Sequence, residues 1–177
     1  MGKTEKKKSD FFFPGKTKSY EKEHTKIRKS YLVRCKRLDD LCKKEIIDLE
    51  TPFVDERGEI QPLVDAMMKS AVMIKSKAGS MRANHYHKTD WHYCYVISGE
   101  IEYYHRKTNS SLPKKKTIVK KGQMVFTPPM VDHAMVFNVD TTFLTLSRNF
   151  RDQQTYESDV VRIELIDPKN FITWKPQ

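Results

Sequence analysis

Among the six histidines of the chain are His85, His87, His92 and His133. Histidine is the most frequent metal-binding side chain in proteins. Side chains alternate between the two faces of an extended strand, so His85 and His87 project from the same face. Their rings are then close enough to share one ion, and the His-x-His pair is half of a chelating site. Imidazole nitrogens suit divalent zinc, iron, copper or nickel, and spacing alone does not choose among these metals.

The residues around these histidines have the pattern of short β-strands. Runs rich in Val, Ile, Tyr, Phe and Thr predict strands over 59–63, 71–76, 81–87, 92–98, 101–105, 117–120, 124–127, 134–137, 142–147 and 160–166. Many short strands without a strong helical pattern among them indicate a sandwich or a barrel. Ser98-Gly99 predicts a hairpin turn. Because His92 and His133 lie on later strands, they complete the metal site only if the sheet curls into a barrel.

The N-terminal part differs from this β-rich region in charge. The chain has 177 residues, with 33 Lys plus Arg and 23 Asp plus Glu. Residues 1–45 hold 15 basic and 7 acidic residues, so their net charge is +8 and +2 remains for the rest. We predict a basic, largely disordered arm over 1–27, a helix and connector over 28–50, and a folded domain over 51–177. The helix is predicted from an apolar stripe at Tyr31, Cys35, Leu38, Cys42, Ile46 and Leu49.

Composition also limits the class of protein. The folded part is nearly neutral and contains no nucleic-acid-binding motif, so a solvated tail is the simplest interpretation of the basic arm. An electrostatic tether to phosphate-bearing partners is the alternative. No apolar run approaches the roughly 20 residues that cross a bilayer, and no apolar signal-peptide core follows the lysine-rich start. We expect a cytoplasmic protein whose partners include neither a membrane nor nucleic acid.

The spacing of residues across 53–166 resembles the two motifs of the cupin superfamily, whose members are small jelly-roll barrels. The first motif, G-x5-H-x-H-x3,4-E-x6-G, is matched by Gly79, His85, His87 and Gly99, with His92 in place of the glutamate. The second, G-x5-P-x-G-x2-H-x3-N, is matched by Gly122, Pro128 and His133, while Met130 replaces the glycine and Phe137 the asparagine. The resemblance implies an all-β fold, a double-stranded β-helix, preceded by the basic arm and the short helix.

Three short segments, 55–60, 82–89 and 155–159, carry a narrower resemblance. They are similar to cupin domains of polysaccharide assembly, notably the metal-binding C-terminal domain of capsular polysaccharide epimerase-reductases. More distantly, they resemble keto-sugar 3,5-epimerases and 3,4-ketoisomerases that act on nucleotide-linked sugars. This resemblance implies a divalent metal, a nucleotide-sugar or carbohydrate ligand, and a homodimer. The alternative is that these segments only form turns and brace the barrel.

The replacement of the glutamate by His92 changes the expected charge of the site. In cupins that resemble this chain the glutamate is an anionic ligand, so a site made of His85, His87, His92 and His133 would keep the full charge of the ion. Such a site attracts an oxyanion or polarises a carbonyl strongly. Two alternatives stay open. His92 points away and three ligands remain, or the histidines line a barrel mouth without a metal and bind each other through hydrogen bonds.

The chemistry that the resemblance implies also needs acid, base and cation groups. Isomerising a keto-sugar removes a proton next to a carbonyl, which requires a base, an acid and a stabilised enediolate. The acid and base candidates are His105, Tyr95 and Tyr104, although ordinary barrel packing is an alternative for the tyrosines. The candidate cations for a nucleotide diphosphate are Arg82, Lys88, Arg106 and Arg148, for which salt bridges or solvation are equally good explanations.

The leading functional hypothesis is therefore a metal-binding cupin that epimerises or isomerises a nucleotide-linked keto-deoxy-sugar. An iron- or copper-dependent cupin dioxygenase is the second hypothesis, because histidine-rich cupins also resemble enzymes that cleave carbon–carbon bonds with oxygen. A carbohydrate-binding cupin module without catalysis is the third.

Overall fold

The computed structural model describes residues 44–173. Its strands are β1 (Ile46–Ile47), β2 (Phe53–Asp55), β3 (Gly58–Ile60), β4 (Ser70–Ser76), β5 (Ser80–His87), β6 (His92–Ser98), β7 (Glu100–Lys107), β8 (Lys115–Lys120), β9 (Met124–Thr127), β10 (Val131–Phe137), β11 (Thr141–Ser147) and β12 (Val160–Arg162). A helix, α3 (Gln153–Asp159), and a 3-10 turn, η1 (Pro168–Asn170), lie near the C-terminal end. The predicted arm over 1–27 and most of the predicted helix lie outside the described residues.

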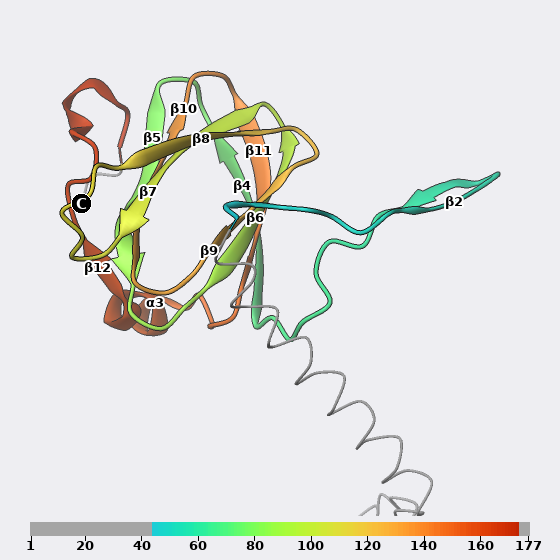
Figure 1. The fold of residues 1–177 in the computed structure, drawn as a ribbon, viewed down its shortest axis with the longest axis horizontal. Helices are drawn as coiled ribbons and strands as arrows, with labels where there is room; N and C mark the ends of the chain where they lie inside the picture. The colour runs from blue at the N-terminus through green and yellow to red at the C-terminus, as the bar shows by residue number, and fades with distance from the viewer. Residues whose placement is uncertain (1–43, 174–177) are drawn as a thin grey trace, which may run out of the picture. The chain divides into compact units, whose positions relative to one another are not determined.

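The strands form two five-stranded antiparallel sheets, β1-β9-β6-β11-β4 and β12-β5-β10-β7-β8, and a separate hairpin of β2 and β3. From β4 to β7 each strand lies in the opposite sheet from the one before, and β9 to β12 repeat this alternation. Figure 1 shows the two sheets facing each other, with α3 at one end of the barrel. This connectivity confirms the predicted double-stranded β-helix. Among residues 44–173, no helix combines the length and apolar character needed to cross a membrane.

The apolar core lies between the two sheets and shows which strand faces point inward. It contains Cys94 and Val96 of β6, Ile101 and Tyr103 of β7, and residues of four further strands. Tyr93 and Tyr95 of β6 lie on the opposite face, in a second apolar cluster. Because side chains alternate along a strand, His92 shares the inner face with Cys94 and Val96.

The hairpin predicted at Ser98-Gly99 is present, since β6 ends at Ser98 and β7 begins at Glu100. Gly99 has φ +79°, in the left-handed region that favours glycine. A Cβ atom at this position would collide with the side chain of Thr141 and would lie 2.6 Å from the backbone oxygen of Asp140. Gly99 therefore allows β11 to approach the turn closely.

Two elements differ from the sequence-based expectation. The connector region contains β1, in which Ile46 pairs with Val125 of β9. Residues 153–159 form α3, whose N-cap Asp152 accepts a hydrogen bond from Thr155 N at 2.9 Å. The sequence QQTYESD has a single large apolar side chain, so the hydrophobic periodicity that identifies most helices is absent here.

Candidate functional site

Three buried histidines form a row across neighbouring strands of the second sheet. In the strand register, His85 of β5 lies directly opposite His133 of β10, and His133 lies opposite His105 of β7. Directly opposite residues on antiparallel strands project from the same face of the sheet. This face is the inner one, because Tyr103 precedes His105 by two residues and belongs to the core. The sheet thus lines the barrel interior with a row of imidazoles.

A β-bulge just before His85 sets the direction of the His-x-His pair. Ala83 and Asn84 have φ values of 62° and 65°, and the register between β5 and β10 shifts at this point. The Asn84 carboxamide oxygen accepts hydrogen bonds from the backbone N–H groups of Leu165 and Ile166, both at 3.0 Å. Asparagine tolerates the left-handed conformation better than most residues, and a bulge re-aims the side chains that follow it. Sequence reasoning missed this role of Asn84.

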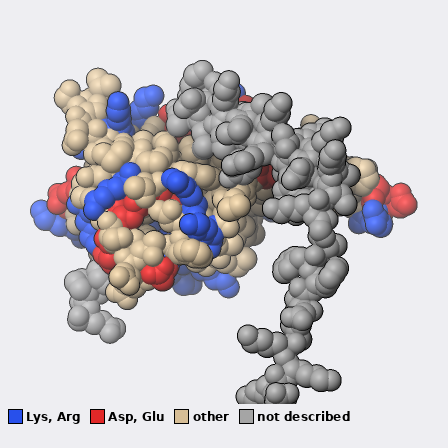
Figure 2. Space-filling model, turned by 90° about the horizontal axis from the view of Figure 1, so that it is seen from below, with Lys and Arg blue, Asp and Glu red and all other residues tan. Residues whose placement is uncertain are grey.

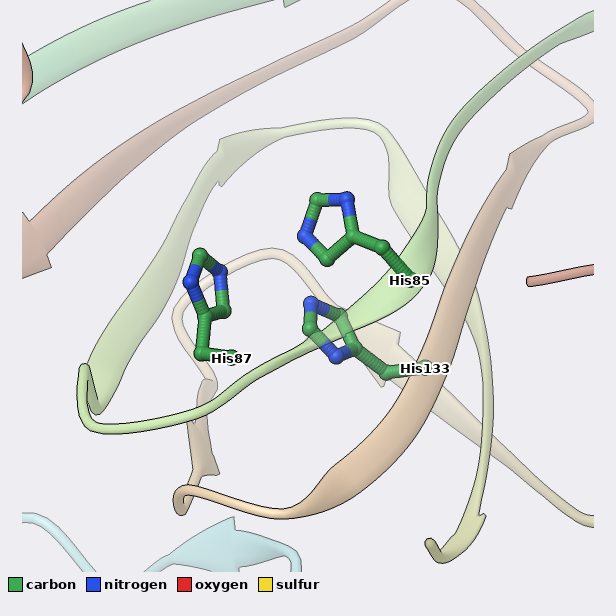
Figure 3. A group of neighbouring side chains, drawn as sticks. All are labelled: His85, His87 and His133. Carbon is green, nitrogen blue, oxygen red and sulfur yellow. The ribbon is translucent and has the colours of Figure 1, made fainter. Parts of the chain in front are cut away.

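His85, His87 and His133 each offer one ring nitrogen that could bind a metal ion. These three nitrogens lie within 4.8 Å of one another. The centroid of the His85 ring lies 4.8 Å from that of His87 and 4.7 Å from that of His133. Figure 3 shows the three rings converging from β5 and β10. The His92 ring, from the other sheet, lies 5.2 Å from that of His87 and 5.3 Å from that of His133. The structure thus brings the four predicted histidines together.

A buried carboxylate that sequence reasoning missed joins this cluster. Asp90, in the turn between β5 and β6, forms a second group of donor atoms with His87 and His92, again within 4.8 Å of one another. His92 belongs to this second group and not to the first. Asp90 stands one residue short of the earliest position that the first cupin motif allows for its glutamate, and that short spacing was the only signal for it in the sequence.

Hydrogen bonds orient two of the four imidazoles. Nδ1 of His87 donates to Oδ2 of Asp159 at 3.0 Å, and Nδ1 of His133 donates to the backbone oxygen of Val131 at 3.0 Å. Each bond fixes the tautomer and leaves Nε2 with an unshared electron pair. Burial raises the pKa of Asp159, but hydrogen bonds from Thr89, Asp90 and His87 outweigh it and lower that pKa. Asp159 is therefore an ionised partner of His87.

The four imidazoles are held in the neutral form. Burial lowers the pKa of His133 to about 3, with a further contribution from His87. Burial followed by the neighbouring imidazoles also lowers the pKa values of His85 and His92. For His87, burial lowers the pKa although Asp90 and Asp159 oppose the shift. Neutral imidazoles backed by a carboxylate and a carbonyl are the form in which histidine binds metals, so this donor set fits a divalent ion.

A small pocket lies beside the cluster and contains His105, the predicted base. Its lining is Lys44, Glu45, Tyr103, His105, Phe126, Pro128 and Val131. Nε2 of His105 is buried and has no hydrogen-bond partner within the described part of the chain. The nearest carboxylate oxygen, Oε1 of Glu45, is 3.5 Å away. Burial lowers the pKa of His105 while Glu45 opposes the shift, so a neutral imidazole faces this pocket.

The structure corrects the prediction that Tyr95 and Tyr104 supply acid or base groups beside the histidines. Tyr95 packs in the second apolar cluster, outside the barrel interior. The hydroxyl of Tyr104 donates to Glu102 at 2.8 Å, on the opposite face of β7 from His105. The inward tyrosine is Tyr103, whose hydroxyl lies 2.9 Å from that of Thr127. Strand alternation explains both corrections.

The four predicted cations bind groups of the protein away from the imidazoles. The contacts are Arg82 Nε to Ser76 Oγ at 2.7 Å, Lys88 Nζ to Ser158 O at 2.8 Å, Arg106 Nε to Asp132 Oδ2 at 3.1 Å, and Arg148 Nη1 to Thr89 O at 3.3 Å. Figure 2 shows Lys and Arg side chains interspersed with Asp and Glu on the face seen from below. None of these four contacts involves a histidine of the cluster.

A cation that sequence reasoning missed lies closer to the histidines. The Arg151 guanidinium carbon is 5.1 Å from the centroid of the Tyr156 ring, which is 5.9 Å from that of His87. After burial and nearer groups, Arg151 is a further cause of the low pKa of each of the four histidines. Arg151 lies four residues before segment 155–159, and no motif in the sequence marked it.

Comparisons with known proteins agree with the geometry. Residues 72–147 match the family model of the cupin domain. A sugar 3,4-ketoisomerase from Thermoanaerobacterium thermosaccharolyticum in complex with TDP is 17% identical, with a TM-score of 0.54 over 66% of this chain and 85% of its own. The dTDP-4-dehydrorhamnose 3,5-epimerase of Sulfolobus tokodaii is 18% identical, with a TM-score of 0.56 over 74% of this chain and 91% of its own.

A third structure, the TDP-quinovose 3,4-ketoisomerase of Campylobacter jejuni, is 18% identical, with a TM-score of 0.54 over 64% of this chain and 94% of its own. The comparison with curated proteins gave no match. At these identities the structural likenesses establish the fold alone. The family match spans the strands that carry both histidine motifs, so residues 72–147 match a cupin domain and the barrel has the cupin jelly-roll fold.

Proposed function

We propose that this cupin is a metal-dependent enzyme that epimerises or isomerises a nucleotide-linked keto-deoxy-sugar in polysaccharide or glycan biosynthesis. The observation that carries the proposal is the inward row of His85, His133 and His105. Toward β5, this row offers converging metal-binding nitrogens. Toward β7, it offers a buried imidazole nitrogen that has no hydrogen-bond partner among residues 44–173. Proton transfer next to a carbonyl needs a group that stabilises the charge on the oxygen and a base within reach of the carbon. The metal-binding nitrogens and His105 lie on the same inner face of the sheet.

The residues fit the steps of this reaction. Ring nitrogens of the histidine cluster would hold a divalent ion, which would supply Lewis acidity at the ketone oxygen. His105 Nε2 accepts the proton from the carbon next to the carbonyl. In an isomerisation the imidazolium returns it to the neighbouring carbon on the same face, and in an epimerisation the new proton comes from water on the opposite face. Glu45, at 3.5 Å, stabilises the imidazolium that forms.

The ligand class is supported by the relatives. One of the solved structures is a sugar 3,4-ketoisomerase in complex with TDP, and the other two are named as enzymes of dTDP- or TDP-linked sugars. Arg151 is the cation that we expect to lie nearest a bound anion, because its charge acts on all four imidazoles. The homodimer implied by the cupin resemblance belongs to the same proposal.

The test is incorporation of deuterium from solvent into a panel of nucleotide-linked keto-deoxy-sugars. We expect the metal-loaded protein to exchange the proton next to the carbonyl in at least one sugar. His105→Asn should slow this exchange by about 10²- to 10⁴-fold, the usual contribution of a general base. Tyr104→Phe is the matched control, because Tyr104 lies on the outer face of the same strand. Absence of exchange in every sugar would overturn the proposal.

One observation favours a second candidate, an iron-dependent oxygenase. The group formed by His87, Asp90 and His92 contains two imidazoles and one carboxylate, a ligand set typical of non-haem iron oxygenases. Oxygen uptake by the iron-loaded protein, without deuterium exchange, would support this candidate. A carbohydrate-binding module would show neither activity.

A further inference from the structure

The group formed by His87, Asp90 and His92 has a feature that the cupin resemblance does not assign, a carboxylate from the turn before β6. All three residues are at most 5% exposed, and their donor atoms lie within 4.8 Å of one another. We propose that Asp90 is a ligand of the metal centre, together with His87 and His92. This inference rests on the metal dependence proposed above.

The surroundings of Asp90 hold its carboxylate in place. Oδ1 accepts a hydrogen bond from the backbone N–H of Asn149 at 2.9 Å. The backbone N–H of Asp90 donates to Oδ2 of Asp159 at 3.2 Å, and the same oxygen of Asp159 binds His87. Asp90 and one of its co-ligands are thus positioned by a single carboxylate on α3. A carboxylate has about four lone-pair directions, so these contacts leave it able to bind an ion.

Within the described residues, the carboxylate of Asp90 has no lysine or arginine partner. Three carboxylates are buried in the described part of the chain, namely Asp90, Asp132 and Asp159. Asp132 pairs with Arg106 at 3.1 Å, whereas Asp159 is compensated by hydrogen bonds from Thr89, the backbone of Asp90 and the neutral His87. Asp90 forms no ion pair with a lysine or arginine among residues 44–173. A buried carboxylate without a cation is costly.

A divalent ion accounts for this uncompensated carboxylate. The ion would otherwise bring its full charge into a buried set of neutral imidazoles, which is costly for the same reason. Asp90 offsets part of that charge. The site then contains an anionic ligand even though His92 occupies the glutamate position of the first cupin motif, and it differs from the all-imidazole site that the sequence predicts.

The test compares metal affinity in two variants of the full chain, purified without an affinity tag and stripped with a chelator. Asp90→Asn keeps an oxygen for the Asn149 N–H but removes the negative charge. Asp132→Asn is the matched control, because it removes another buried carboxylate whose partner is Arg106. Binding of Co²⁺ and Zn²⁺ is measured by competition with a chromophoric chelator, and the Co²⁺ absorption spectrum reports the ligand set.

We expect Asp90→Asn to weaken binding of both ions by at least about 10-fold and to change the Co²⁺ spectrum, while Asp132→Asn does neither. Thermal unfolding of each metal-free variant shows whether the barrel still folds. His92→Asn, the second variant, should weaken binding in the same way. Unchanged affinity and spectrum in Asp90→Asn, with normal binding by the unmodified chain, would overturn the inference alone. Failure of the unmodified chain to bind either ion would overturn the proposed metal dependence as well.

Discussion

At the scale of single residues, Asp159 connects α3 to the histidine cluster. Its Oδ1 accepts hydrogen bonds from the backbone N–H and the hydroxyl of Thr89, both at 2.7 Å, and its Oδ2 accepts from His87 and Asp90. Asp159→Asn replaces one of these oxygens with an amide nitrogen, which cannot accept from the donors that face it. We expect the metal-free protein to lose about 1–3 kcal/mol of unfolding free energy, measured by urea denaturation.

Glu157→Gln is the control for this prediction, since it changes a carboxylate on the same helix. Glu157 pairs with Arg162 at 2.7 Å, and both side chains are substantially exposed. Exposed ion pairs contribute little, so this variant should stay within about 1 kcal/mol of the original stability. Equal losses in the two variants would contradict the role assigned to Asp159.

At the scale of elements, substitutions at two glycines distinguish the cost of backbone strain from the cost of a steric collision. Gly99 and Gly122 have φ values of +79° and +80°, so alanine at either position strains the backbone similarly. A Cβ at Gly99 would also meet Thr141 and Asp140 of the neighbouring strand region, whereas a Cβ at Gly122 would meet nothing within 4 Å. Gly122→Ala should cost about 1 kcal/mol, and Gly99→Ala should cost clearly more. Thermal unfolding measures both, and an equal loss would show that the hairpin can move away from β11.

The strands could be predicted from the sequence because alternation is a local property. In β6 the alternation put His92, Cys94 and Val96 on one face, and the core has this arrangement. Helix α3 could not be predicted in this way, because its packing depends on Asp159 and Tyr156 reaching residues about 70 positions earlier. The bulge at Asn84 depends likewise on distant backbone groups at 165 and 166. Contacts of this kind leave no periodic pattern.

At the scale of the whole molecule, the site also has a part that strand alternation predicts and a part that it does not. The four histidines were found because they occupy positions of the two cupin motifs, with His92 in the place of the glutamate. Asp90 and Arg151 lie outside the strands, where alternation does not determine the direction of a side chain. For the candidate cations, the sequence did not show the neighbouring groups that bind them, such as Asp132 for Arg106 and Ser76 for Arg82.

The folded barrel buries four imidazoles whose pKa values are lower than in the unfolded chain. Its stability therefore depends on pH. Burial lowers the pKa of His133 to about 3 and also lowers the pKa values of His85, His87 and His92. An unfolded histidine has a pKa of about 6.5, so below that pH the unfolded chain binds more protons than the folded one. Burial raises the pKa of Asp90, which opposes this effect at lower pH.

The stability of the metal-free protein should therefore be constant above about pH 6.5 and fall as the pH decreases. One such histidine costs about 2 kcal/mol by pH 5, and several together cost more. Urea denaturation between pH 7.5 and 5.0, with a chelator present, measures this loss. Hydrogen bonds lower the pKa values of the exposed Asp55, Asp140 and Asp152. These carboxylates therefore change the unfolding free energy only below about pH 4, outside the pH range of this measurement. A flat stability across this range would mean that the imidazoles accept protons in the folded barrel and that water reaches the cluster.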